Sequence, residues 1–133
     1  RYDSWNQMTD PRIPKQTVCV LDDNLDVLQS LQFLLECHGF LVRAFSAAVA
    51  LLVSINPDDV DCLVIDYKMP HMDGLDVAIR LRQRNVSAPI ILVTGYDDEQ
   101  MTEKATAAGI NHVLFKPHLE DSLVRRIRDV IAR

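Results

Sequence analysis

The stretch Cys62-Leu63-Val64-Ile65-Asp66 decides the fold, because four apolar residues in a row end in a single carboxylate. A short continuous apolar run of this kind is typical of a strand buried on both faces, as in a parallel sheet. Three further runs have the same form and also end in polar residues. They are residues 18–21 before Asp22-Asp23, residues 90–93 before Thr94-Gly95, and residues 113–115 before Lys116-Pro117.

Apolar residues at helical spacing lie between these runs, so strand and helix are expected to alternate along the chain. The first expected helix carries Leu28, Leu31, Leu34 and Leu35 and ends at His38-Gly39. The further strands are expected at 40–45, 61–66, 89–94 and 112–115. The helices between them are expected at 47–55, with Ser46 as the N-cap, at 75–84 and at 97–108. The helix at 75–84 has Leu75, Ala78, Ile79 and Leu81 facing inward, and a final helix carries Leu119, Leu123, Ile127, Val130 and Ile131. This alternation predicts an α/β fold, a parallel sheet with helices on both faces.

The composition bounds the class of protein. The chain has 133 residues, 48% of them hydrophobic and 25% charged, which predicts one globular domain with its own core. We expect a tail or linker at 1–15 and the domain at 16–133. The net charge of −5 makes direct nucleic-acid binding by this domain unexpected, and no apolar stretch is long enough for membrane insertion. The three cysteines lack a metal-binding spacing and are expected to be free thiols, as in a reducing compartment.

The polar residues that end the strands should meet, because ligands bind beyond the carboxyl ends of strands in open parallel sheets. Three carboxylates brought together, Asp22, Asp23 and Asp66, either hold protons or hold a cation. Oxygen ligands of this kind suit Mg²⁺. Lys116 and the Thr94 hydroxyl are then placed to contact phosphate oxygens, and aspartate is a known nucleophile for phosphorus. The pattern therefore favours phosphoryl transfer.

The chain resembles the response-regulator receiver domains of two-component signalling. The resemblance covers roughly residues 16–132. It is carried, in order, by Leu21-Asp22-Asp23, by Asp66 with the following Met69-Pro70-His71-Met72-Asp73-Gly74, by Thr94-Gly95 and by Lys116-Pro117. Each motif alone is weak, but the set at the ends of the expected strands is specific. Asp73-Gly74 is expected to have a structural role, because it can form a turn and cap the following helix.

The resemblance implies a doubly wound, flavodoxin-like fold with five helices and a five-stranded sheet in the order 2-1-3-4-5. Asp66 would accept the phosphoryl group, and Lys116 and Thr94 would contact it. Asp22, Asp23, Asp66 and the backbone carbonyl of Lys68 would hold Mg²⁺. Such a domain is a cytoplasmic switch rather than an enzyme.

The resemblance also implies partners. A histidine kinase or phosphotransfer protein would supply the phosphoryl group. An output partner would bind the face formed by the helix at 97–108, the strand at 112–115 and the final helix. The thin apolar face of the helix at 97–108, with Met101, Ala105 and Ala108, permits a homodimer without requiring one.

One departure leaves an alternative open. The family has an aromatic residue three positions before the lysine, and here that residue is Val113, with His112 and Phe115 out of register. A phosphorylation-independent interaction module is therefore the main alternative. An aspartate-nucleophile phosphatase would need a second acid where Lys68 stands, and a flavodoxin-like cofactor binder would need a loop rich in Ser, Thr and Gly after the first strand.

Overall fold

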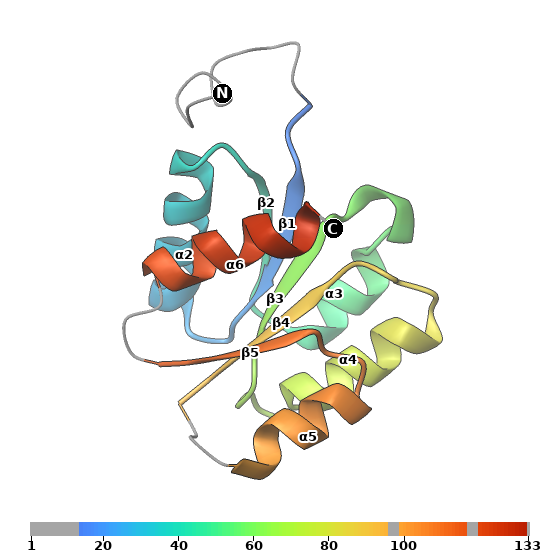
Figure 1. Ribbon diagram of the computed structural model, residues 1–133. Helices are drawn as coiled ribbons and strands as arrows, with labels where there is room; N and C mark the ends of the chain where they lie inside the picture. The colour runs from blue at the N-terminus through green and yellow to red at the C-terminus, as the bar shows by residue number, and fades with distance from the viewer. Residues whose placement is uncertain (1–13, 96–98, 117–119, 133) are drawn as a thin grey trace.

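The structure, a computed structural model, describes residues 14–95, 99–116 and 120–132. Strands and helices alternate along the chain, and a short 3₁₀ segment, η1, precedes the third strand (Figure 1). The elements are β1 (Thr17–Leu21), α2 (Leu25–Cys37), β2 (Leu41–Phe45), α3 (Ala48–Ser54), η1 (Pro57–Asp59), β3 (Cys62–Asp66), α4 (Gly74–Gln83), β4 (Ile90–Thr94), α5 (Glu99–Ala107), β5 (His112–Phe115) and α6 (Glu120–Ile131). Within the described part of the chain, no helix is both long and apolar enough to cross a bilayer.

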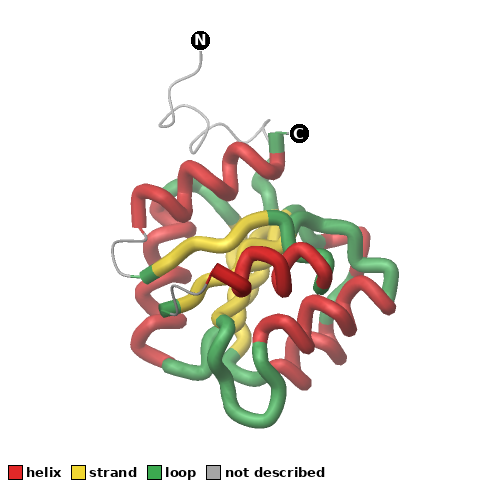
Figure 2. Tube along the Cα trace, turned by 60° about the horizontal axis from the view of Figure 1, so that its bottom comes forward, coloured by secondary structure: helices red, strands yellow, loops and turns green. Residues whose placement is uncertain are grey.

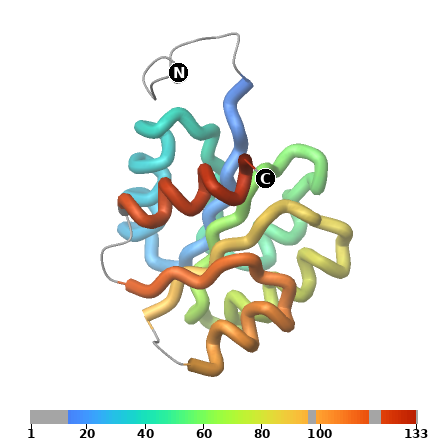
Figure 3. Tube along the Cα trace, in the orientation of Figure 1, coloured from blue at the N-terminus to red at the C-terminus, as the bar shows by residue number. Residues whose placement is uncertain are grey.

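The five strands form one parallel sheet in the order β2-β1-β3-β4-β5, as expected from the sequence. From β1, which lies next to the β2 edge, the chain moves to that edge and then returns past β1 to add β3, β4 and β5 on the other side (Figure 3). All strands point the same way, so their carboxyl ends share one edge of the sheet. The order of the strands therefore decides which chain segments meet there.

Helices cover both faces of the sheet (Figure 2). Alternate residues of each strand point to opposite faces, so each strand serves two cores. One core lies under α3, α4 and α5 and is built around Leu51, Leu63, Leu81 and Leu92. The other lies under α2 and α6 and is built around Leu35, Val64, Ile91 and Ile127. Burial on both faces explains why the strands read as continuous apolar runs rather than as alternating patterns.

The structure corrects two local expectations. Ser46 is not the N-cap of α3. The N-cap is Ala47, which makes no side-chain cap hydrogen bond. The position of this short helix is set instead by the burial of Leu51 and Leu52. Ile79 does not face inward. The buried face of α4 is formed by Gly74, Val77, Ala78 and Leu81, and Ile79 is exposed beside the cleft between α4 and α5.

Other expectations agree with the structure within the residues it describes. The strands expected at 40–45, 61–66 and 89–94 each begin one residue later than predicted, which is the usual uncertainty of an element's end. The helix expected at 47–55 spans Ala48–Ser54. The three cysteines are free, with Cys19 and Cys62 buried and Cys37 exposed. Residues 1–13, the expected helix start at Asp97, and Leu119 lie outside the described residues.

Arg82, near the end of α4, ties two loops together at the edge of the sheet opposite the carboxyl ends. Its Nε and one terminal nitrogen donate to the Gly109 carbonyl at 3.0 and 2.7 Å. The other terminal nitrogen donates to the carbonyls of Val86 and Ala88. A fifth hydrogen bond reaches Asn111 Oδ1, which also accepts from the Ile90 backbone. All five donors of a guanidinium are therefore used.

Substituting Arg82 with methionine should lower the free energy of unfolding by about 2–4 kcal/mol, because hydrogen bonds from a charged group are strong and the carbonyls lose their partner. Urea unfolding followed by circular dichroism measures this loss. Arg80→Met, at an exposed position of the same helix, is the matched control and should change stability by less than about 0.5 kcal/mol. Equal losses in the two variants would show that the Arg82 hydrogen bonds add nothing to stability.

Candidate functional site

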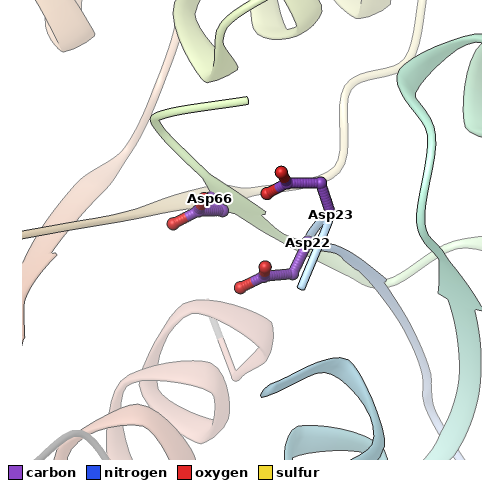
Figure 4. A group of neighbouring side chains, drawn as sticks. All are labelled: Asp22, Asp23 and Asp66. Atoms are coloured by element: carbon purple, nitrogen blue, oxygen red, sulfur yellow. The ribbon is translucent and has the colours of Figure 1, made fainter. Parts of the chain in front are cut away.

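Three aspartates converge at the carboxyl edge of the sheet. Asp22 and Asp23 directly follow β1, and Asp66 is the last residue of the neighbouring strand β3. Their carboxylates point to the same side of the sheet edge (Figure 4). One oxygen from each lies within 4.8 Å of the others. Asp22 and Asp66 are buried and Asp23 is exposed, so the cluster opens to solvent on one side.

The backbone around the first two acids holds Asp22 in place. Its Oδ1 accepts a hydrogen bond from the Asn24 backbone N–H at 2.9 Å. Asn24 is also the N-cap of α2, and its side-chain oxygen accepts from the N–H groups of Asp26 and Val27. Since Asn24 caps the helix, neither aspartate is needed for that purpose, and both carboxylates remain available to the site.

Thr94 and Lys116 complete the site from the other two strands. Thr94 ends β4 and is buried, and Lys116 follows β5. Lys116 Nζ lies 3.2 Å from Asp66 Oδ1 and donates a hydrogen bond to it. The acids, Thr94 and Lys116 line one cavity of about 360 Å³ together with Asn24, Val27, Lys68 and Gly95. One liquid water occupies about 30 Å³, so this cavity has room for several waters.

Burial and mutual repulsion shape the electrostatics. Burial raises the pKa of Asp66 above its ordinary value, and the Asp22 charge raises it further, against the opposing effect of Lys116. Burial likewise raises the pKa of Asp22, although the Asn24 hydrogen bond lowers it. Three carboxylates facing one ammonium group carry an excess of negative charge. A divalent cation would relieve this repulsion and displace any bound proton.

The donor set suits Mg²⁺ by its chemistry, because this ion binds oxygen ligands at about 2.0–2.1 Å in an octahedron. In that geometry neighbouring ligands lie about 2.9 Å apart and opposite ligands about 4.2 Å apart. The three carboxylate oxygens lie within 4.8 Å of one another, so the side chains would close around a bound ion. Their cavity also leaves room for the waters that Mg²⁺ usually keeps.

Gly74 positions the loop after Asp66. Its N–H donates to the Tyr67 carbonyl at 2.8 Å and closes the loop at 67–73. A Cβ at Gly74 would lie 2.7 Å from the Asp66 carbonyl oxygen and 2.6 Å from Leu92 Cδ1, closer than atoms pack. Asp73 caps α4, as expected from the sequence, and the structure adds that it does so in a capping box with Asp76. The sequence did not reveal that Gly74 packs directly against the backbone of Asp66, since this contact arises only in the folded chain.

Comparisons with known proteins place the chain in a family. Residues 18–128 match the response regulator receiver domain. The chain belongs to the response regulator receiver domain family. It is 37% identical over 111 residues to the response regulator protein TodT of Pseudomonas putida, covering 84% of this chain and 49% of TodT. It is 32% identical over 117 residues to the transcriptional regulatory protein FixJ of Bradyrhizobium diazoefficiens, covering 88% of this chain and 57% of FixJ.

A solved structure shows the same fold. The receiver domain of Francisella response regulator 1452 superposes with a TM-score of 0.83 at 27% identity, over 90% of this chain and 98% of that domain. The receiver domain described here spans about half the length of TodT. The family match begins at residue 18, and the domain boundary at residue 16 stays a prediction.

Replacing Gly74 with alanine should destabilise the receiver domain by about 1–3 kcal/mol, because the added methyl group overlaps the Asp66 carbonyl and Leu92. Chemical denaturation measures the loss. Gly95→Ala is the matched control within the same site, since nothing lies within 4 Å of a Cβ placed there. A Gly74→Ala variant as stable as Gly95→Ala would refute the proposed close packing.

Stability should depend on pH through Asp66. The pKa of Asp66 in the folded state lies above that of an unfolded aspartate, which is about 3.9. The folded protein therefore has more stability below about pH 3.9, and it loses this part of its free energy of unfolding as the pH rises through the folded-state pKa. Without divalent cations, Asp66→Asn should therefore be more stable than wild type at pH 7 and no more stable near pH 4. Urea unfolding across this range tests the sign. An exposed control, Asp129→Asn, should show no such gain, and a less stable Asp66→Asn at pH 7 would contradict the analysis.

Proposed function

We propose that Asp66 accepts a phosphoryl group and that this modification switches the domain. The observation that carries the proposal is the meeting of three carboxylates, a lysine and a threonine in one cavity at the carboxyl edge of the sheet. Members of the receiver family are phosphoacceptor switches, and no enzymatic family is indicated by the comparisons. The domain is accordingly proposed to be a switch that assists its own phosphorylation rather than an enzyme with a released product.

Each residue has a proposed role in the transfer. A carboxylate oxygen of Asp66 attacks phosphorus, and the bond from phosphorus to the donor nitrogen breaks with its electron pair staying on nitrogen. Lys116, already paired with Asp66, contacts the phosphoryl oxygens and balances their charge. Thr94 ends β4 in the same cavity, and its hydroxyl donates a hydrogen bond to a phosphoryl oxygen.

Mg²⁺ is the proposed cofactor. Asp22, Asp23 and Asp66 would hold it, with the backbone carbonyl of Lys68 as a fourth protein ligand, since Lys68 lines the same cavity. When bound, the ion would neutralise the acids and the incoming phosphoryl group. Because protons must leave Asp22 and Asp66 before they bind a metal, the affinity for Mg²⁺ should rise with pH.

The partners follow from the chemistry. The phosphoryl donor is proposed to be a histidine kinase or a phosphotransfer protein. The domain is proposed to act in the cytoplasm. The output partner is proposed to bind the face of α5, β5 and α6, and a second copy of the chain is one candidate for it. The net charge of −5 favours a protein partner over nucleic acid for this domain.

Two other functions fit the site less well. An aspartate-nucleophile phosphatase would need an acid two residues after Asp66, where the exposed Lys68 lies. A flavodoxin-like cofactor binder would place phosphate beside Asp22 and Asp23, where their charge repels it. A phosphorylation-independent module has no need of the three clustered acids, but it is the alternative that the experiment below decides.

The test is intact-mass analysis after incubation with acetyl phosphate. Wild-type protein should gain one phosphoryl group in the presence of Mg²⁺ and none after its removal by EDTA. Asp66→Asn should gain none, because it lacks the nucleophile. Lys116→Met should be phosphorylated about 100-fold more slowly, comparable to the loss of one charge-stabilising donor in other enzymes.

The outcomes distinguish a domain that cannot be phosphorylated from one whose phosphoryl group is hydrolysed quickly. An adduct that needs both Mg²⁺ and Asp66 supports the proposal, whereas an adduct that persists in Asp66→Asn overturns the assigned nucleophile. If wild type shows no adduct, titration with beryllofluoride distinguishes rapid hydrolysis from absent chemistry. Tight binding that depends on Mg²⁺ and Asp66 would indicate rapid hydrolysis, and no binding would favour the phosphorylation-independent module.

A further inference from the structure

Another cavity lies at the amino edge of the sheet, opposite the three aspartates. Gln16, Asp61 and Pro89 directly precede β1, β3 and β4. They line this amino-edge cavity together with His112, which begins β5. Its volume of about 450 Å³ lies within the range of about 300–1,000 Å³ that is typical of ligand sites. The parallel order of the strands brings these residues together, just as it brings the acids together at the other edge.

The walls of the amino-edge cavity are of two kinds. Pro89, with Val130 and Ile131 from the last turn of α6, supplies apolar surface. Asp61 supplies a carboxylate, whose Oδ2 accepts the Thr17 backbone N–H at 2.8 Å. A carboxylate can accept several hydrogen bonds, so Asp61 can take a further donor. The cavity therefore suits a group that has an apolar body and carries a hydrogen-bond donor.

The chain enters the sheet beside this cavity. Gln16 lines the cavity, and its carbonyl accepts the Leu41 backbone N–H at 2.9 Å, which fixes the point where the preceding residues leave the sheet. The start of β1 and the end of α6 lie at the same end of the molecule (Figure 1). Residues 1–13 are therefore tethered at the rim of the cavity, and the short tether gives them a high effective concentration there.

This N-terminal segment, residues 1–13, carries a group of the required kind. Trp5 is the only tryptophan of the chain, and an indole combines a large apolar surface with one N–H donor. Between Trp5 and β1 lies Asp10-Pro11, a dipeptide that favours a turn. The chain from Gln16 to Pro11 spans at most about 18 Å, and the chain from Pro11 to Trp5 at most about 22 Å. A chain that reverses at this turn can therefore bring Trp5 back to the cavity.

We propose that the N-terminal segment folds back over the amino edge of the sheet and places the Trp5 indole in the amino-edge cavity. The ring packs against Val130 and Ile131, and its N–H donates to the Asp61 carboxylate. Burial of the apolar surface of the ring drives the contact, and the tether raises its effective concentration at the cavity. The segment is thus an intramolecular partner of α6 and holds the carboxyl end of that helix against the sheet.

This contact is separate from the site at Asp66. The two sites lie at opposite ends of the strands, and β3 alone spans five residues, or about 17 Å. Since α6 belongs to the proposed output face, a segment bound at its end restrains that face in a way that does not require phosphorylation. The contact can accordingly be tested without any phosphodonor.

The test follows the fluorescence of Trp5 in the full chain. Selective excitation of tryptophan reports on this residue alone, because the chain has no other tryptophan. We expect native protein to emit at shorter wavelength than protein unfolded in urea, and acrylamide to quench it with less than half the quenching constant. Emission and quenching equal to those of the unfolded chain would overturn the proposal.

A blocked cavity identifies the binding site. Ser87 is exposed and lines the cavity, so the long side chain of a Ser87→Arg variant occupies it and can pair with Asp61. We expect this variant to raise the quenching constant of Trp5 to the value of the unfolded chain. Ser30→Arg, at an exposed position of α2 outside the lining, is the matched control and should leave it unchanged. With folding of both variants verified by circular dichroism, equal protection of Trp5 in wild type and Ser87→Arg would refute the assigned site.

Two further measurements identify the partner. In ¹H–¹⁵N correlation spectra, Trp5→Ser should shift the backbone amide resonances of Asp61, His112 and Ile131 and leave that of Asp66 unchanged. Shifts confined to residues away from the cavity would place the segment elsewhere and overturn the proposal. The protection of Trp5 should also be independent of protein concentration, since protection that rises with concentration would mean that the segment binds a second copy and would overturn the intramolecular contact.

Discussion

The repulsion among three carboxylates at the end of β1 and β3 is the constraint on which the rest of the site depends. Asp22 and Asp66 are held in buried positions by strands that are themselves buried on both faces, so they cannot move apart to reach water. Burial raises the pKa values of both groups, and the Asp22 charge raises that of Asp66 further. The fold thus holds negative charges close together in a partly buried site. A cation or an electrophilic phosphorus centre bound there would reduce the repulsion between the carboxylates.

The surroundings keep this arrangement rigid on one side and open on the other. Gly74 packs against the Asp66 carbonyl, and the Asn24 backbone holds the Asp22 carboxylate. At the opposite edge of the sheet, Arg82 fastens the loops that follow α4 and α5. The exposed Asp23 and the cavity leave access for a donor. This packing would let the proposed site bind a charged group without rebuilding its own backbone.

Thr94 and Lys116 connect the acids to the far edge of the sheet. Both line the cavity, and the Lys116 backbone N–H donates a hydrogen bond to the Thr94 carbonyl. This edge, with α5 and α6 on either face of it, is where a change of state is expected to reach the surface.

The sequence by itself determined the parallel α/β fold and which polar residues meet at one edge of the sheet, because buried strands are continuous apolar runs and the residues at their carboxyl ends share that edge. Local patterns also identified the capping of α4 by Asp73. Tertiary structure decided the rest. The inward face of α4, the start of α3, the five hydrogen bonds of Arg82 and the pairing of Phe115 with Thr94 all depend on contacts between distant segments. Such contacts leave no periodic signal in the chain, since each is set by how two elements pack and not by either element alone.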